Sequence, residues 1–130
     1  MRQAKITEEW VKKEVKKILN QYKPRLHWWM PAAGMYGVSG QHDFLICQDG
    51  MFWSIETKCG NNTPTDNQIT FALAIKKAGG FSLMINEKNI DEVKRIAEYL
   101  NRIGTAMEWG EGETNLGHDF SIWRKNASTK

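Results

Sequence analysis

Two acidic residues and a lysine flank a predicted hairpin near the middle of the chain. Asp49-Gly50 is among the strongest short-range signals for a two-residue hairpin turn, because both positions accept a positive φ. The flanking apolar runs are HDFLICQ and MFWSIETK. Counting outward from this turn along both strands places Asp43 directly opposite Glu56. The two carboxylates are therefore predicted to face each other.

This arrangement needs a positive charge nearby. Cross-strand partners have Cβ atoms roughly 4.5 to 5.5 Å apart, and like charges placed this way repel. Lys58 lies two residues after Glu56 and points to the same side of the strand. Because unpaired buried carboxylates are costly, the pattern indicates a site for a hard divalent cation. The alternative is a structural Glu56–Lys58 ion pair with Asp43 exposed at the strand end.

Alternating elements on both sides of the hairpin must position these residues. Thr7 can cap a helix that runs to about Tyr22, with apolar residues at helical spacing. A bulky segment at about residues 26–32, LHWWMPA, is typical of a strand, and a Gly-rich loop follows at 34–40.

The second half of the chain continues this alternation. Pro64 and Thr65 open a helix to about Ala78, where Gly79-Gly80 stops it. The run FSLMIN is then predicted to be a buried strand, and a final helix spans about residues 90–103. GHDFSIWR is a further candidate edge strand. The order helix, three strands, helix, strand, helix predicts an α/β sandwich with a mixed sheet.

Size and composition agree with one compact domain. The chain has 130 residues, and its 41% hydrophobic fraction is sufficient to build a core. No apolar run approaches the roughly 20 residues that span a bilayer, and the N-terminus lacks a signal-peptide pattern. We expect a soluble protein without a membrane partner. Cys47 and Cys59 are expected to be reduced, with Cys47 in the core.

Basic residues collect near the N-terminus, although the net charge is only +3. Such a cluster is usually a solvated face, and contact with phosphate is the functional alternative. The residues concerned are Lys12, Lys13, Lys16, Lys17, Lys23 and Arg25.

The pattern of motifs resembles a known nuclease group. Asp43, the hairpin and Glu56-Thr57-Lys58 are similar to the D…(D/E)xK core of the PD-(D/E)XK nuclease superfamily. The surrounding sequence, from about Thr7 to Val93, resembles its VRR-NUC branch. The shared features are an early helical glutamate, a W-x-P-like segment, a Gly-rich loop ending in G-x-x-D-F/I, an ExK strand, T-x-x-Q and a GG-apolar strand. Short phage-encoded, stand-alone members look most similar.

The resemblance implies a fold and a boundary. We expect a restriction-endonuclease-like mixed central sheet flanked by helices, with an αβββαβ core. The whole chain, 1–130, would be a single VRR-NUC-like domain with its core at about 7–103. Residues 104–130 would be a C-terminal extension without an assigned role. A phage protein of this kind would act in the cytoplasm of a bacterial host cell.

The resemblance also implies roles for individual residues. Asp43 and Glu56 would bind Mg²⁺ or Mn²⁺, with the Thr57 carbonyl as a backbone ligand. Lys58 would position or help to deprotonate the attacking water and stabilise charge on the phosphate. Glu8 matches the early glutamate and would complete the metal shell. The alternatives are that Glu8 only favours the helix dipole, or that Glu14 takes its place.

Further residues carry weaker expectations. Gln68 matches the glutamine of T-x-x-Q and is assigned a catalytic role, although Thr65 to Gln68 is also a capping box. The loop residues Tyr36, Ser39 and Gly40, together with Lys12 and Lys16, are candidate DNA contacts.

His42 departs from the superfamily pattern, which usually has proline before the aspartate. Its expected role is structural. The alternatives are a group behind the metal ligands or a contact with DNA.

These expectations define a metal-dependent DNA endonuclease. We expect a homodimer acting on branched DNA, such as a four-way junction, by analogy with stand-alone VRR-NUC proteins. One rival is a catalytically inactive DNA-binding accessory protein with the same fold, and another is a nickase or flap nuclease. A Cys59 nucleophile with a histidine base has no supporting spacing.

Overall fold

A computed structural model describes residues 5–32 and 39–104 of the chain. The elements occur in the order predicted from the sequence, and the candidate strand GHDFSIWR lies outside the described residues. The helices and strands are α1 (Glu8–Asn20), β1 (Leu26–Trp29), β2 (Phe44–Gln48), β3 (Met51–Thr57), α2 (Asp66–Lys77), β4 (Phe81–Ile85) and α3 (Asp91–Ile103).

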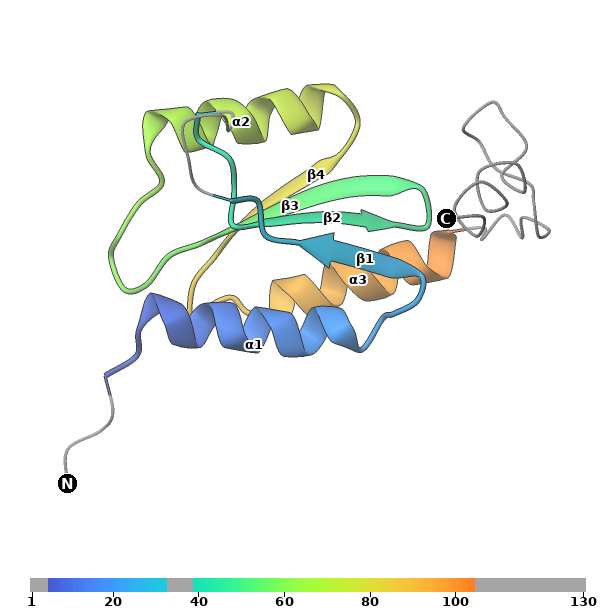
Figure 1. The fold of residues 1–130 in the computed structure, drawn as a ribbon, viewed down its shortest axis with the longest axis horizontal. Helices are drawn as coiled ribbons and strands as arrows, with labels where there is room; N and C mark the ends of the chain where they lie inside the picture. The colour runs from blue at the N-terminus through green and yellow to red at the C-terminus, as the bar shows by residue number, and fades with distance from the viewer. Residues whose placement is uncertain (1–4, 33–38, 105–130) are drawn as a thin grey trace, which may run out of the picture.

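The strands form one mixed sheet in the order β1-β2-β3-β4. β1 pairs antiparallel with β2, β2 pairs antiparallel with β3, and β4 pairs in parallel with β3. Figure 1 shows α1 and α3 on one face of the sheet and α2 on the opposite face. The predicted α/β fold with a mixed central sheet is confirmed.

The first helix begins at the predicted cap. The Thr7 side chain accepts a hydrogen bond from the Trp10 backbone N–H at 3.1 Å, which satisfies one of the free donors at a helix N-terminus. Val11, Val15 and Leu19 form the buried stripe, as their spacing predicted.

None of the helices within residues 5–32 and 39–104 has the length and apolar character that a membrane span requires.

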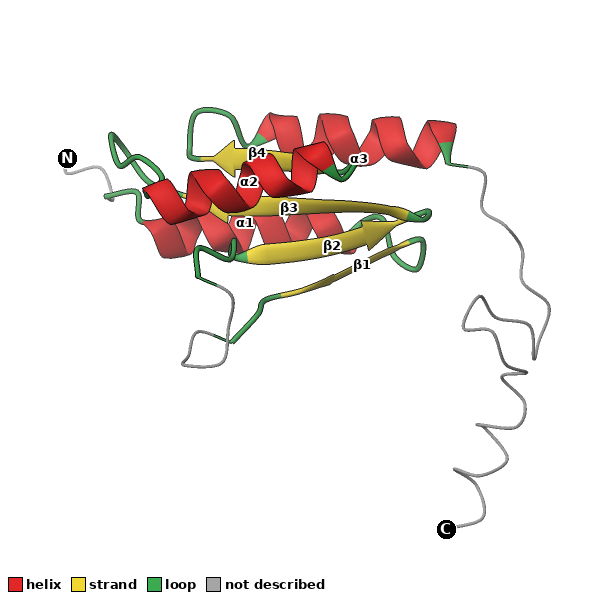
Figure 2. Ribbon diagram, turned by 90° about the horizontal axis from the view of Figure 1, so that it is seen from above, coloured by secondary structure: helices red, strands yellow, loops and turns green. Residues whose placement is uncertain are grey.

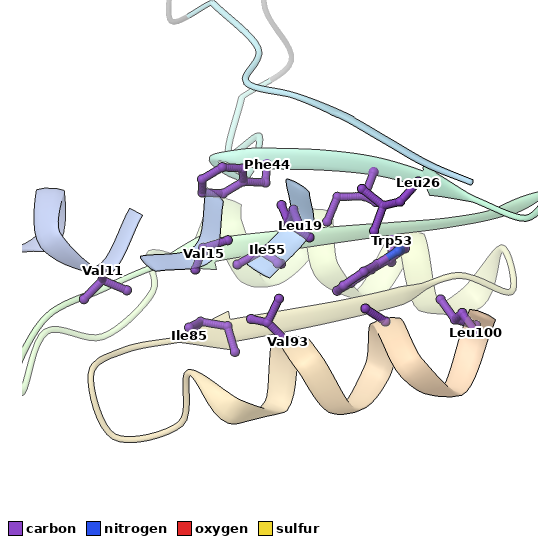
Figure 3. Packing of buried hydrophobic residues seen from close by; sticks show 12 residues of the cluster. Val11, Val15, Leu19, Leu26, Phe44, Trp53, Ile55, Ile85, Val93 and Leu100 are labelled. Atoms are coloured by element: carbon purple, nitrogen blue, oxygen red, sulfur yellow. The ribbon is translucent and has the colours of Figure 1, made fainter. Parts of the chain in front are cut away.

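The main hydrophobic core lies between the sheet and the helices α1 and α3. Figure 3 shows side chains from β2, β3 and β4 directed at those of the two helices. The fully buried members are Val11, Val15, Leu19, Leu26, Phe44, Ile46, Trp53, Ile55, Ile85, Val93, Ala97 and Leu100. This core packs α1 against α3 and against the strands β1 and β3.

The hairpin between β2 and β3 has the predicted turn and register. Asp49 and Gly50 have φ values of 49° and 83°, and a type I′ turn needs a positive φ at both of these positions. Phe44 pairs with Ile55. One further step outward from this pair brings Asp43 opposite Glu56.

The sheet face that α2 covers differs from the prediction. The helix contacts β3 and β4 but leaves β1 and part of β2 uncovered; Figure 2 shows β1 and β4 at opposite edges of the sheet. Cys47 is therefore exposed, and its predicted core position was wrong, although both cysteines are free as expected. β4 is an edge strand in which only Ile85 is buried and the other four residues are half-buried, so the prediction of a buried strand at FSLMIN was wrong.

Candidate metal centre and active site

Three carboxylates from separate parts of the chain converge at one end of the hairpin. Glu8 comes from the first turn of α1, Asp43 immediately precedes β2, and Glu56 lies near the end of β3. One oxygen of each carboxylate lies within 4.8 Å of the others. Carboxylate oxygens are the donors that Mg²⁺ and Mn²⁺ take in proteins. The cluster therefore fits a hard divalent cation.

The orientation of Asp43 is fixed by Thr57. Asp43 Oδ2 accepts a hydrogen bond from the Thr57 backbone N–H at 2.9 Å and a second, short one from the Thr57 hydroxyl. The other oxygen, Oδ1, lies 3.9 Å from the Lys12 ammonium. Because Thr57 is fully buried, this clamp is protected from solvent.

Glu56 is almost completely buried, with an exposed fraction of 3%. Its Oε1 accepts from the Asp43 backbone N–H at 3.2 Å. Its Oε2 accepts from the Gln68 side-chain amide at 2.9 Å and lies 3.4 Å from the Lys58 ammonium. Burial and the negative charge of Asp43 raise the pKa of Glu56 to about 7, against the opposing effect of Lys58. A cation at the cluster would favour the ionised form.

The Glu56–Lys58 ion pair and the carboxylate cluster are both present. The metal site and the structural ion pair, which the sequence offered as alternatives, are therefore compatible. Asp43 is half-buried and its side chain is 23% exposed. The exposed Asp43 of the structural alternative is therefore wrong. Glu14 does not contribute to the cluster; its carboxylate pairs with the Lys17 ammonium at 3.0 Å on α1.

Gln68 both caps α2 and contacts the carboxylate cluster. Its side-chain oxygen accepts from the Thr65 backbone N–H at 2.9 Å, and its backbone N–H donates to the Thr65 hydroxyl at 3.2 Å. This is the predicted capping box. The amide nitrogen of the same side chain donates to Glu56. The cap thus holds the Gln68 amide at the carboxylate cluster.

Two candidate DNA contacts from the Gly-rich loop pack against the start of α2. Ser39 Oγ accepts from the Asn67 side chain at 2.8 Å. Gly40 has a φ of 79°, and a Cβ at this position would lie 2.3 Å from the Asn67 carbonyl oxygen. Glycine is therefore required here by the packing of the loop on the protein. Tyr36 lies outside the described residues.

The basic cluster separates into different environments. Lys12 lies between Glu9 and Asp43, with ammonium-to-carboxylate distances of 3.6 and 3.9 Å. Lys16 lies one turn further along α1 and is half-buried. Lys17 pairs with Glu14. Of these three lysines, only Lys12 contacts a member of the carboxylate cluster.

Arg25 makes contacts within the fold. Its Nε donates to Asp49 Oδ1 at 2.7 Å, and its Nη2 donates to the carbonyl oxygens of Asn101 and Gly104 at 3.1 and 2.9 Å. Arg25 therefore ties the hairpin turn to the end of α3.

His42 is 1% exposed. Its ring nitrogens lie within hydrogen-bond distance of Ser54 Oγ and the Gln68 carbonyl, both at 2.9 Å. Burial lowers the pKa of His42 below its ordinary value. Such a position excludes the direct DNA contact considered from the sequence. Ser54 and Ser82 complete this network, and no sequence motif distinguished either serine.

Two solved structures share the α/β fold of this chain. A structure described as "VRR_NUC domain" superposes with a TM-score of 0.52 at 19% identity, over 75% of this chain and 97% of the other. A second, "VRR_NUC domain protein", superposes with a TM-score of 0.53 at 20% identity, over 75% and 91%. The chain has the VRR-NUC fold, as its motifs predicted. No family model and no curated protein matches the sequence.

Proposed function

We propose that the protein is a metal-dependent DNA endonuclease that hydrolyses phosphodiester bonds. The observation that carries this proposal is the convergence of Glu8, Asp43 and Glu56 within 4.8 Å, with the Lys58 ammonium 3.4 Å from Glu56. The VRR-NUC fold around the cluster supports the same function. Three acids and a lysine at one end of a buried hairpin are more than a stable fold requires, because buried like charges oppose folding.

The three carboxylates would hold Mg²⁺ or Mn²⁺, with the Thr57 carbonyl as a further ligand. The Thr57 N–H points towards Asp43. Within a strand, the N–H and C=O of one residue point to the same side, which supports the carbonyl as a ligand. When bound, the cation supplies a more acidic water and neutralises charge on the phosphate.

Lys58 and Gln68 are the remaining proposed catalytic residues. The Lys58 side chain is 17% exposed, and its ammonium lies 3.4 Å from Glu56 Oε2. We assign to it the positioning of the attacking water, or help in its deprotonation, and the stabilisation of negative charge on the phosphate. Gln68 fixes the Glu56 carboxylate through its amide.

DNA is the proposed substrate, held by Lys12, Lys16 and the loop that contains Tyr36, Ser39 and Gly40. Lys12 links this surface to the cluster because its ammonium lies beside Asp43. A branched substrate and a homodimer belong to the proposal through the likeness to stand-alone VRR-NUC proteins. Two active sites in a dimer would suit paired incisions across a junction.

A cleavage assay with a matched lysine control tests the function. Labelled four-way junctions and linear duplexes are incubated with Mg²⁺ and wild type, Lys58→Ala or Lys94→Ala. Lys94 is exposed on α3 and lies 4.0 Å from Glu98, far along the chain from the site. We expect junction cleavage by wild type and Lys94→Ala, and a loss of at least about a hundredfold in Lys58→Ala.

The outcomes separate the alternatives. Equal cleavage by wild type and Lys58→Ala contradicts the proposed site, and binding without cleavage by wild type indicates an accessory protein. Flap and nicked duplexes run in parallel identify a different substrate choice through the ratio of cleavage rates. Sedimentation of wild type with and without junction DNA measures the expected dimer, and a monomer in both conditions contradicts it.

A further inference from the structure

The ring of His42 is enclosed between the sheet and α2. Its Nδ1 lies 2.9 Å from Ser54 Oγ on β3 and 3.3 Å from Ser82 Oγ on β4. The two serine hydroxyls are themselves 2.8 Å apart. The Phe71 ring of α2 lies against the imidazole, with centroids 4.8 Å apart. His42 therefore contacts three separate elements.

The other ring nitrogen is bonded to the backbone of α2. His42 Nε2 lies 2.9 Å from the Gln68 carbonyl oxygen. A carbonyl only accepts hydrogen bonds, so Nε2 carries the proton and donates it. In the neutral ring, Nδ1 then accepts from Ser54. With both nitrogens used and 1% of the residue exposed, the ring has no free group for metal or DNA.

The partner of His42 is the residue that also contacts the carboxylate cluster. The Gln68 amide donates to Glu56 Oε2 at 2.9 Å, while His42 holds the carbonyl of the same residue. Asp43, the next residue after His42, donates its own backbone N–H to the other Glu56 oxygen at 3.2 Å. The His42 ring thus bonds the residue that donates one hydrogen bond to Glu56, and His42 directly precedes the residue that donates the other.

We propose that His42 is a positioning residue that sets the Glu56 carboxylate for metal binding, acting through the backbone of Gln68. This inference rests on the proposed function in that the oriented group is a metal ligand. The physical reason is that the capping box alone leaves the first turn of α2 free to shift along the sheet, whereas the His42 bond fixes the Gln68 backbone relative to β3. Groups that orient metal ligands commonly change affinity by 10- to 100-fold when removed.

Two variants at one position test this role. His42→Met has a similar size but no N–H donor, whereas His42→Gln retains an amide N–H that can reach the Gln68 carbonyl. Calorimetric titration with Mn²⁺ in the absence of DNA measures the dissociation constant. We expect His42→Met to weaken Mn²⁺ binding by about tenfold or more and His42→Gln to recover most of this loss. Equal Mn²⁺ affinity for wild type and His42→Met, even with a lower Tm, overturns the proposal.

A double-mutant cycle with Gln68→Ala identifies the route of the effect. If His42 acts through Gln68, His42→Met combined with Gln68→Ala binds Mn²⁺ no more weakly than Gln68→Ala alone. Additive losses overturn that route.

Nuclear magnetic resonance of the metal-free protein tests this inference separately from the proposed function. It also provides a test if His42→Met fails to fold. In wild type, the ¹⁵N signals should show protonated Nε2 and unprotonated Nδ1, and the Gln68 side-chain amide should exchange slowly with solvent. His42→Gln should preserve this slow exchange, and the opposite tautomer in wild type overturns the proposal. If wild type binds no Mn²⁺ but loss of the His42 donor frees the Gln68 amide, the proposed function fails and the positioning role stands.

Discussion

Thr57 holds one oxygen of Asp43 with two donors, its backbone N–H at 2.9 Å and its hydroxyl. The other oxygen, Asp43 Oδ1, lies 3.9 Å from the Lys12 ammonium. The side-chain hydroxyl is the donor that a substitution can remove without altering the strand.

Thr57→Val tests this clamp because valine has nearly the same shape and keeps the backbone donor. We expect Mn²⁺ affinity to fall by about tenfold, since the carboxylate gains rotational freedom. The free energy of unfolding should fall by only about 1 kcal/mol. Calorimetric titration and urea denaturation measure the two quantities. Unchanged Mn²⁺ affinity would show that the hydroxyl does not orient the ligand.

Glu8 and Glu14 form a matched pair on α1. Only Glu8 lies in the cluster, while Glu14 pairs with Lys17. We expect Glu8→Gln to weaken Mn²⁺ binding by at least about tenfold and Glu14→Gln to leave it unchanged. Both variants remove one negative charge, so a similar loss in each would indicate a general electrostatic effect and contradict Glu8 as a ligand.

Lys12 should have opposite effects on metal and on DNA. Its ammonium lies 3.9 Å from Asp43 Oδ1, where its charge opposes a second cation. We expect Lys12→Met to bind Mn²⁺ several-fold more tightly without DNA. The same variant should bind junction DNA more weakly in EDTA, with the slope of log affinity against log salt smaller by about one. An unchanged salt slope would remove Lys12 from the DNA contacts.

The stability of the metal-free protein should depend on the ionisation of Glu56. Its pKa is raised from 4.5 to about 7 on folding, so the folded state binds this proton more tightly than the unfolded state. The stabilisation is complete below pH 4.5 and is lost as the pH rises to about 7, by at most about 3 kcal/mol.

Comparison with Glu56→Gln isolates this contribution. The pKa of His42 is lowered from its ordinary value of 6.5, so His42 destabilises the folded state as the pH falls below 6.5. Because both proteins keep His42, this effect cancels in the comparison. Urea denaturation in EDTA from pH 4.5 to 8 measures the difference in unfolding free energy. A difference that does not change with pH would contradict the raised pKa.

Arg25 should contribute to stability and not to DNA binding. The Asp49 side chain is only 2% exposed, and Arg25 is its partner at 2.7 Å. Arg25→Met leaves this carboxylate buried without its cation, so we expect a loss of about 2 kcal/mol in unfolding free energy. Lys13→Met removes the same charge from an exposed position on α1 and should change stability by less than about 0.5 kcal/mol. A loss of junction affinity specific to Arg25→Met would return Arg25 to the DNA surface.

Local signals predicted most of the fold. The Asp49-Gly50 turn, the Thr7 and Thr65 caps and the apolar stripe of α1 all depend on residues within a few positions of one another. The opposition of Asp43 and Glu56 followed from turn geometry alone, because a two-residue turn fixes the register of the whole hairpin. The motifs then predicted the VRR-NUC fold that the structural comparisons show.

Other features could not be predicted because they depend on where helices dock. Cys47 belongs to an apolar run, yet it is exposed because α2 covers only part of the sheet. In the sequence, Arg25 is grouped with the other basic residues near the N-terminus, and only the structure shows its contacts with the end of α3. Neither the width of sheet that a helix covers nor the partner of a long side chain is encoded in local spacing.

The sequence by itself determined that Asp43, Glu56 and Lys58 share one end of a hairpin, because strand pleating and a tight turn leave their side chains little choice. Only the tertiary structure decided that Glu8, rather than Glu14, lies with Asp43 and Glu56, and that His42 bonds the residue whose amide holds Glu56. Those contacts join residues 12 to 48 positions apart, and they are set by the packing of α1 and α2 against the sheet.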